Sequence, residues 1–333
     1  MRVLVTGASG MLGRRTAETL EARGDDVTVL QRRPSGLPFR EVLGDVADPG
    51  VVAGAVRGQD AVLHLAAKVD VVGRWEDYVH ANIEGTRAVV AACRSAGVGR
   101  LVQVSSPSVA HAGEPLVGVG AAPADPVAAR GHYARSKAVS ETEALAADGP
   151  DLAVLAIRPH LVWGPGDTQL VARIVARARA GRLPVLGSGA ALIDTTYVDN
   201  AADALVAATD ACVPAHGRAL VASNGEPRPV LEVLQRLCAA ARVSPPSRRV
   251  PPWAGWVAGT LVEGFWGLTG RTETPPLTRF LVEQLTTAHW FDQRETRRLL
   301  GWSPAVSLDE GFTRLAEWCA AQSTSPARER PDG

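Results

Sequence analysis

A tyrosine and a lysine stand four residues apart, at Tyr133 and Lys137. On a helix, residues i and i+4 lie on one face, so this spacing places the phenol beside the ammonium. A free phenol has a pKa of about 10 and is a poor acid–base group at neutral pH. A neighbouring ammonium stabilises the phenolate and lowers that pKa toward the working range. The pair predicts a proton-transfer site.

Lysine is scarce in this chain. Lysine and arginine together number 35, but the lysines are Lys68 and Lys137 alone. The two residue types are not interchangeable where a compact point charge is needed. We therefore expect Lys137 to act through such a charge and to reach ribose hydroxyls. Lys68 follows a strand-like run at its carboxyl end, where a cofactor or substrate contact and a surface ion pair both fit.

A glycine-rich segment, Thr6–Gly13, lies directly after the strand-like run Arg2–Thr6 and directly before a helical pattern. In this context the first glycine permits a tight turn, the second lets backbone N–H groups approach a pyrophosphate, and the third allows close helix–strand packing. The helix N-terminus then favours phosphate. The predicted dinucleotide-binding residues of this turn are Gly7, Ser9, Gly10, Met11, Leu12 and Gly13.

The end of the next strand, Val27–Gln31, indicates which dinucleotide binds. NAD-type sites carry an acid there, whereas this chain reads Gln31-Arg32-Arg33. Two guanidinium groups suit a 2′-phosphate, which favours NADP(H) over NAD(H); a solvated loop in an arginine-rich chain is the alternative. Further residues of the kind that line adenine and ribose follow later strands: Asp45, Val46, Leu65, Ala66, Ala67 and Lys68.

Strand-like and helix-like segments alternate over the first 160 residues, which predicts an α/β fold with a Rossmann-type doubly wound parallel sheet. The expected strands are Arg2–Thr6, Val27–Gln31, Ala61–Leu65, Leu101–Val104 and Ala153–Ile157, with helices at 12–23 and 82–96. The expected division is a dinucleotide-binding domain over 1–160, with 192–222 returning to it. A smaller α/β substrate-binding subdomain covers 161–191 and 223–322, and a disordered tail covers 323–333.

Composition excludes several classes of protein. The 333 residues carry equal numbers of acidic and basic side chains, 35 each, which argues against a nucleic-acid partner. The chain opens without a secretory signal, and its longest uncharged apolar run, Val250–Val262, is too short to span a bilayer. Four scattered cysteines support neither a disulfide framework nor a metal site. These features predict a cytoplasmic protein without metal.

Together these motifs resemble the extended short-chain dehydrogenase/reductases, over nearly the whole chain to about Trp318. The resemblance implies that Ser106 positions a substrate carbonyl, although Ser105 stays open for that role and strand capping is the plainer interpretation of Ser106. It further implies that Tyr133 donates the proton, that Lys137 tunes it, and that Asn82 holds a water in a proton relay. Pro159, Leu161 and Val162, in the segment Arg158–Gly166, would approach the nicotinamide, and a homodimer is expected.

Within that family, Ser105–Ala110 is similar to the 3β-hydroxysteroid dehydrogenase-like branch. Ile193 stands where sugar-nucleotide enzymes tend to carry a phosphate-binding arginine. More narrowly, the chain resembles the 2-alkyl-3-oxoalkanoate reductases of bacterial long-chain olefin biosynthesis, which implies NADPH-dependent reduction of a β-keto acid with long alkyl chains. The alternatives are a 3β-hydroxysteroid dehydrogenase with or without isomerase activity, a sugar-nucleotide epimerase or dehydratase, and a non-catalytic NADP sensor. The Tyr133–Lys137 pair disfavours the sensor.

Two groups of aromatic residues stay open. Trp253, Trp256, Phe265 and Trp266 fit an apolar substrate tunnel, a peripheral membrane or partner surface, or plain core or dimer packing. His111 and His160 flank the predicted cleft, where a hydrogen-bonded structural role is favoured over catalysis.

Overall fold

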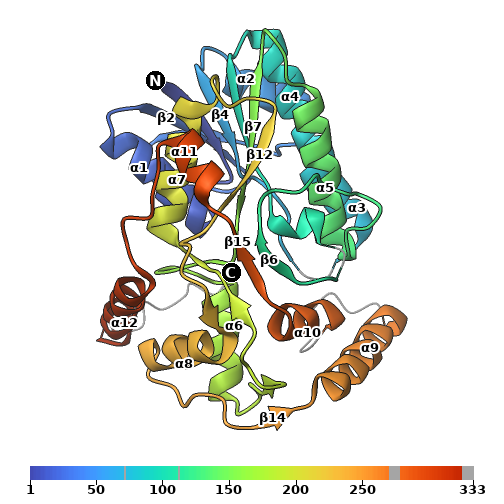
Figure 1. Cartoon of the computed structure of the whole chain (residues 1–333). Helices are drawn as coiled ribbons and strands as arrows, with labels where there is room; N and C mark the ends of the chain where they lie inside the picture. The colour runs from blue at the N-terminus through green and yellow to red at the C-terminus, as the bar shows by residue number, and fades with distance from the viewer. Residues whose placement is uncertain (71–72, 112, 270–277, 325–333) are drawn as a thin grey trace.

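The computed structural model describes residues 1–70, 73–111, 113–269 and 278–324. A seven-stranded sheet, with all of its paired neighbours parallel, forms the centre of the larger part, in the order β12-β7-β5-β4-β1-β2-β3 (Figure 1). This confirms the predicted doubly wound α/β fold. Its strands are β1 (Arg2–Thr6), β2 (Asp26–Gln31), β3 (Arg40–Leu43), β4 (Ala61–His64), β5 (Arg100–Val104), β7 (Ala153–Pro159) and β12 (Arg218–Ala222).

Helices cover both faces of this sheet because its strands are apolar on both sides. The helices are α1 (Met11–Ala22), α2 (Pro49–Val56), α3 (Trp75–Tyr78), α4 (Gly85–Ala96), α5 (Gly131–Ala146) and α7 (Val198–Ala211). One core cluster joins α1 and α7 to the sheet, and another joins α2, α4 and the end of α5 to its other face. Local signals set the helix ends: Asp48 caps α2 by accepting from two backbone N–H groups, and Gly97 ends α4 in the left-handed conformation.

A second, mixed sheet has the order β13-β10-β15-β6, and two short parallel pairs, β11–β8 and β14–β9, lie beside it. These strands are β6 (Leu116–Val119), β8 (Val162–Trp163), β9 (Val185–Leu186), β10 (Leu192–Ile193), β11 (Thr196–Tyr197), β13 (Arg228–Pro229), β14 (Arg249–Val250) and β15 (His289–Phe291). The remaining helices of the chain are α6 (Leu170–Arg179), α8 (Val230–Ala240), α9 (Pro252–Thr269), α10 (Arg279–Thr286), α11 (Arg294–Leu300) and α12 (Leu308–Thr324).

The structure shifts the expected domain division in three places. β6, placed in the first domain from sequence, pairs with β15 in the second sheet. Of the returning segment 192–222, α7 and β12 join the large sheet, whereas β10 pairs with β13 and β15. α11 packs on α7 and β12, so it belongs to the larger part. Of the expected tail, residues 323 and 324 complete α12 and the remainder lies outside the described residues.

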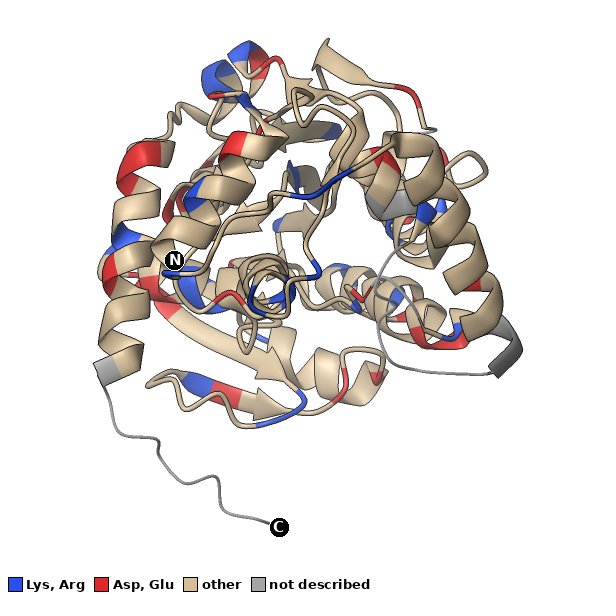
Figure 2. Cartoon of the chain, turned by 90° about the horizontal axis from the view of Figure 1, so that it is seen from below, with Lys and Arg blue, Asp and Glu red and all other residues tan. Residues whose placement is uncertain are grey.

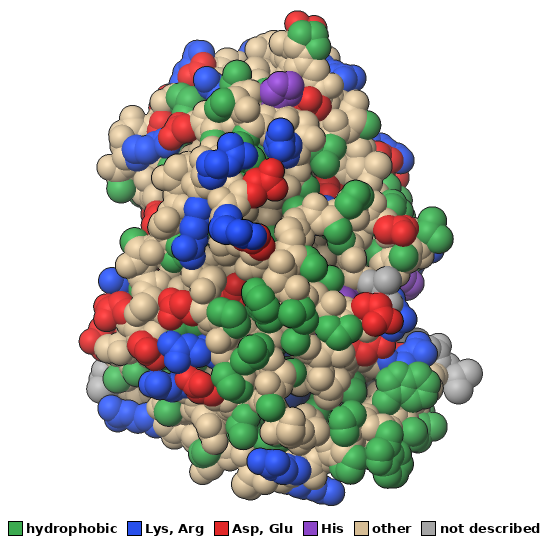
Figure 3. Space-filling view, in the orientation of Figure 1, with side chains coloured by type: hydrophobic (Ala, Val, Ile, Leu, Met, Phe, Trp, Pro, Cys, Tyr) green, Lys and Arg blue, Asp and Glu red, His purple; other side chains and the backbone are tan. Residues whose placement is uncertain are grey.

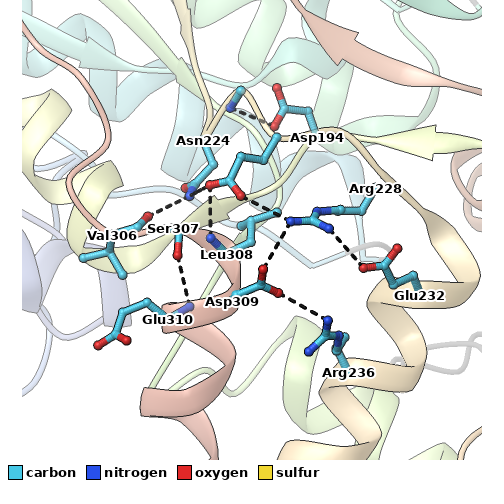
Figure 4. A network of polar contacts seen from close by, with 12 residues as sticks. Asp194, Asn224, Arg228, Glu232, Arg236, Val306, Ser307, Leu308, Asp309 and Glu310 are labelled. Carbon is cyan, nitrogen blue, oxygen red and sulfur yellow. Dashed lines mark hydrogen bonds and ion pairs between the residues drawn. The ribbon is translucent and has the colours of Figure 1, made fainter.

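A polar network attaches α12 to the loop after β12 (Figure 4). Asn224 donates to the backbone oxygen of Val306 at 2.9 Å, and Glu226 accepts from the backbone nitrogen of Leu308 at 3.1 Å. Arg228 and Arg236 both lie 3.4 Å from Asp309. Because Glu226 satisfies the first backbone N–H group of α12 and two arginines hold Asp309 in its first turn, the network fixes where that helix begins.

Acidic and basic side chains alternate along α12, whereas α9 is almost free of charge (Figure 2). The aromatic residues nearest the start of α9 are not packed in the core, because Trp253 is 71% exposed and Trp256 47%. The interpretation of these residues as core packing is therefore wrong.

No helix in the described ranges is long and apolar enough to cross a bilayer.

Candidate active site

One face of α5 carries three ionisable side chains at four-residue intervals: Tyr133, Lys137 and Glu141. α5 packs beside β7 and the short helix η2 (Pro107–Ala110), which follows β5. The Lys137 side chain is only 3% exposed, and its Nζ donates to the backbone oxygen of Val104 at 2.5 Å. The helix thus directs the phenol and the ammonium to the carboxyl end of β5, as the spacing predicts.

Burial shifts both pKa values. Burial raises the pKa of Tyr133, and a hydrogen bond with Ser106 opposes that shift. Burial lowers the pKa of Lys137 to about 8, with the Glu141 carboxylate acting in the opposite direction. The lowered phenol pKa expected from sequence is therefore not a property of the protein groups alone, because the ammonium is directed to Val104 O. The protein groups instead keep Tyr133 protonated, which is the state of a proton donor.

Sequence reasoning missed a buried ion pair that includes Glu141, one helical turn after Lys137. Arg158 and Glu141 are each 1% exposed and meet at 2.5 Å, and Arg158 also donates to Ala122 O at 2.7 Å. The bidentate geometry satisfies both charges in a low-dielectric site. The sequence signal that could have identified Glu141 is its position four residues after Lys137, which itself lies four residues after Tyr133.

The two serines after β5 differ in environment. Ser106 caps η2, and its Oγ accepts from the backbone nitrogen of Ser108 at 3.3 Å and from Ser108 Oγ at 2.9 Å. Since both contacts use Ser106 as an acceptor, its own proton remains available for Tyr133 or a substrate oxygen. Ser105 Oγ is buried with no hydrogen-bond partner in the described chain. The structure therefore places Ser106 rather than Ser105 beside the phenol, while it also performs the capping role.

Asn82 connects the catalytic helix to the loop after β4. It lies in a π-helical turn, η1 (Val79–Glu84), and is 1% exposed. Its Nδ2 donates to Ser136 Oγ at 2.8 Å and to Lys68 O at 3.2 Å, while its Oδ1 accepts from Lys68 N at 2.7 Å. These bonds use both amide hydrogens, so they orient α5 and the loop. The family resemblance implies that Asn82 holds a water, and this role stays a prediction. The second lone pair of Oδ1 is the acceptor left for such a water.

A chain of hydroxyl groups around His64 fixes the position of that turn. Ala66 N donates to Thr6 Oγ1, whose own proton is then directed to His64 Nδ1 at 2.8 Å. His64 Nε2 lies 3.1 Å from Thr86 Oγ1, which donates to Asn82 O at 2.7 Å. Burial, with Lys137 nearby, lowers the pKa of His64 to about 3, so the ring is neutral and carries its proton on Nε2. Sequence reasoning missed this histidine, which holds β1, β4 and η1 together.

The glycine-rich turn fits a dinucleotide. Gly7 has φ +80°, and a Cβ there would lie 2.8 Å from Ala66 N; a Cβ on Gly13 would overlap the Gly7 oxygen. α1 begins without a side-chain cap on Gly10 and without an acidic residue in its first turn. Its N-terminal N–H groups and dipole thus remain available for phosphate, next to Ser9, Met11 and Leu12.

The loop after β2 presents exposed arginines. The Glu41 carboxylate accepts from Ser35 N at 2.9 Å and Ser35 Oγ at 2.7 Å, and it also bonds Gln31. Sequence reasoning did not anticipate this carboxylate from β3. Its Oε1 atom already accepts hydrogen bonds from the loop residue Ser35. Arg32 and Arg33 are exposed and form no ion pair with any residue in the described ranges. Arg14 donates to Ser35 O at 2.9 Å, which brings a third guanidinium to this loop.

The other predicted cofactor residues gather at the same edge of the sheet, because the carboxyl ends of parallel strands meet there. Asp45 and Val46 follow β3, and Leu65, Ala66, Ala67 and Lys68 follow β4. Pro159, Leu161 and Val162 lie at the end of β7, where Leu161 adopts φ +44°, a left-handed conformation that strains a non-glycine residue. Lys68 Nζ lies 3.2 Å from Asp70, so the ion pair expected as one alternative is present.

The two histidines near the cleft are buried and differ in bonding. His160 Nδ1 contacts Asp194 O at 2.5 Å, whereas neither ring nitrogen of His111 has a hydrogen-bond partner in the described part of the chain. Burial lowers the pKa of both, that of His160 to about 3. The structural role predicted for His160 is consistent with this contact.

Fold and site together define an oxidoreductase that uses a nicotinamide dinucleotide. The chain belongs to the NAD dependent epimerase/dehydratase family, whose model matches residues 3–222. The sequence resemblance to the extended short-chain dehydrogenase/reductases is thereby confirmed, and the protein is an NAD(P)-dependent dehydrogenase or reductase.

Three similar curated proteins match over most of their length. A 2-alkyl-3-oxoalkanoate reductase of Stenotrophomonas maltophilia is 43% identical, with 96% of this chain and 100% of the relative covered. One of Shewanella oneidensis is 37% identical, covering 93% and 84% respectively. A 3-beta-hydroxysteroid dehydrogenase of Mycolicibacterium neoaurum is 30% identical, covering 98% and 95%. Among solved structures, MoeE5 in complex with UDP-glucose and NAD has a TM-score of 0.75 at 25% identity, over 98% and 100% of the two chains.

Proposed function

We propose that this protein reduces the ketone of a large hydrophobic β-keto acid, a 2-alkyl-3-oxoalkanoate, to the secondary alcohol with NADPH. A bound reduced nicotinamide supplies the hydride. Tyr133 Oη gives its proton to the carbonyl oxygen, and Ser106 holds that oxygen with the proton that its capping contacts leave free. The Lys137 ammonium stabilises the phenolate that results, and Asn82 keeps α5 in position. This use of the residues follows from the general logic of acid–base catalysis.

The observation that carries the substrate class is the 43% identity to a 2-alkyl-3-oxoalkanoate reductase along its whole length. Ile193 agrees with it, because this buried residue of β10 offers no cation to a diphosphate. The next residue, Asp194, is fully buried and bonded to Ser223 and Gly225. A sugar-nucleotide substrate would therefore lack a charged partner at this position. A 3β-hydroxysteroid dehydrogenase remains the second candidate because of the 30% identity to such an enzyme.

A parallel assay tests the substrate class. The purified enzyme is given a long-chain 2-alkyl-3-keto acid with NADPH, a 3β-hydroxysteroid with an oxidised dinucleotide, and UDP-glucose with an oxidised dinucleotide. Nicotinamide absorbance is followed for the first two, and the sugar-nucleotide product is measured by chromatography for the third. We expect kcat/KM for the keto acid to exceed that for the other two by about 100-fold, roughly 3 kcal/mol of transition-state discrimination. A 2-alkyl-3-ketone without the carboxylate serves as the matched control for recognition of the acid group. Faster turnover of the steroid would contradict the proposal.

The preference for NADPH is supported by the exposed guanidinium groups of Arg32 and Arg33, which form no ion pair within the described ranges, and by the hydrogen bonds that Glu41 accepts from Ser35. We expect Arg32→Ala to weaken NADPH binding by about 10- to 100-fold, because a charge-assisted bond to a phosphate contributes about 1.5–3 kcal/mol. NADH binding should change less than threefold, roughly 0.6 kcal/mol. Titration of intrinsic fluorescence with each dinucleotide measures both constants.

The matched control for this variant is Arg57→Ala. Arg57 is also exposed and without an ion pair in the described ranges, but it lies at the end of α2, before β4 begins, and so away from the carboxyl edge of the sheet. Its removal should leave both dissociation constants unchanged. Equal losses of NADPH and NADH binding in Arg32→Ala would show that this arginine does not recognise the 2′-phosphate.

A further inference from the structure

The first three turns of α9 bury two glycines and leave their largest apolar residues exposed. Gly255 and Gly259 are buried, and a Cβ on Gly259 would lie 2.9 Å from Arg279 N at the start of α10. A Cβ on Gly255 would lie 3.0 Å from Leu186 of β9. A helix whose only purpose is core packing buries its large side chains instead. The orientation of α9 therefore leaves its large apolar residues exposed, where they can contact a surface outside this fold.

The outward residues form a continuous stripe, which we call the α9 stripe: Trp253, Trp256, Val257 and Leu261. Residues 253, 257 and 261 follow at intervals of four and so share one face. Trp253 is 71% exposed and Leu261 69%, with Trp256 and Val257 nearly half exposed. Figure 3 shows apolar side chains gathered over α9 at the lower right of the molecule. Contiguous exposed apolar patches of this kind mark interaction sites.

Exposed arginines lie in the segment before α9 and in a loop whose strand pairs with that segment. Glu263, the only acidic residue of α9, is neutralised by Arg279, whose Nε lies 2.7 Å from its carboxylate. Arg248 and Arg249 precede the helix, and Arg182 lies in the loop that leads to β9, which pairs with β14. These three arginines are exposed and form no ion pair within the described ranges. Blue side chains accordingly lie at the lower edge of Figure 3, beside the apolar ones.

We propose that the α9 stripe docks on a lipid bilayer that carries anionic headgroups. Tryptophan is favoured at the headgroup level, and apolar side chains enter the acyl boundary without a spanning helix. Arginines beside such a stripe attract anionic lipid through the surface potential. A second copy of the chain would instead bring uncompensated arginines to the rim of the contact, because no free carboxylate of α9 accompanies them. This inference does not depend on which ketone the enzyme reduces.

Flotation with lipid vesicles tests the proposal. The full chain is mixed with vesicles of phosphatidylcholine alone or with phosphatidylglycerol, and the bound fraction is measured at low and high salt. We expect binding to the anionic vesicles at low salt, at least tenfold weaker binding for the double variant W253S/L261S, and strong salt sensitivity that R248E/R249E removes. Unchanged nicotinamide turnover of each variant shows that it has folded.

The control V213S removes an apolar residue that is 49% exposed near the end of α7, so its vesicle binding should equal that of the wild type. No flotation with any vesicle would overturn the proposal, as would equal flotation of W253S/L261S and the wild type. A dimer that W253S/L261S dissociates, in a protein that ignores vesicles, would show that a second copy covers the stripe and would equally refute the bilayer.

Discussion

Replacing Tyr133 by phenylalanine should lower kcat for ketone reduction by about 1,000-fold while dinucleotide binding changes little. General acid catalysis is worth about 10²- to 10⁴-fold, and the phenol is the acidic group that the structure places against Ser106. Phenylalanine keeps the aromatic ring of residue 133 and removes only its hydroxyl group, and with it the proton. Single-turnover kinetics at saturating NADPH separates this chemical effect from binding.

Tyr197→Phe is the matched control. Tyr197 is buried against Trp163, with ring centroids 5.5 Å apart, and lies under α12 rather than beside η2. Loss of its hydroxyl should leave kcat within twofold, about 0.4 kcal/mol. If Tyr133→Phe retained wild-type turnover, another group would have to deliver the proton and the proposed role of Tyr133 would be lost.

Local sequence signals predicted five of the seven strands of the large sheet, and β3 and β12 were not among them. β1 has the expected limits, and β4 and β5 differ from expectation by one residue at one end each. The reason is physical: fully buried parallel strands are short apolar runs, and Gly7 and Gly97 take the left-handed conformations that end or redirect the chain. The candidate dinucleotide site could be predicted for the same reason, because its residues follow the carboxyl ends of these strands.

The second sheet could not be obtained in this way. Its strands have only two to four residues and pair across long separations, as when Leu116 aligns with His289. The chain from 192 to 198 is divided between β10 and β11, which pair with different partners, and then enters α7. No local pattern specifies such pairings, because their free energy comes from distant residues. α9 begins at Pro252, and proline is well tolerated in the first turn of a helix, so the prolines before Trp253 do not exclude a helix there.

The site shows the same division between local and distant information. The Tyr133–Lys137 pair is a local spacing on one helix and was found. Arg158, from β7, meets Glu141 across a separation of 17 residues, and His64 joins Thr6 to Thr86 from three different elements. Glu141 and His64 interact electrostatically with Lys137. Local sequence patterns cannot identify the partners of these groups, because only the fold brings them together.

Lys137 should give the reaction its alkaline limit. Burial lowers its pKa to about 8, so the ammonium is present below that pH and is lost above it. The Tyr133 pKa is raised, so the phenol stays protonated over the same range. We therefore expect kcat/KM for ketone reduction to fall as the pH rises through about 8. Lys137→Met should lower kcat about 100-fold at pH 7, because no cation then stabilises the phenolate.

Lys137→Arg provides the decisive comparison for this prediction. A guanidinium keeps its charge above pH 12, so this variant should retain part of the activity and lose the decline near pH 8. Its larger planar head fits poorly where Nζ approaches Val104 O at 2.5 Å, which is why we expect a reduced plateau rather than wild-type turnover. Profiles of kcat/KM from pH 6 to 10 for wild type and both variants measure the effect. An unchanged decline in Lys137→Arg would assign the alkaline limit to a group other than Lys137.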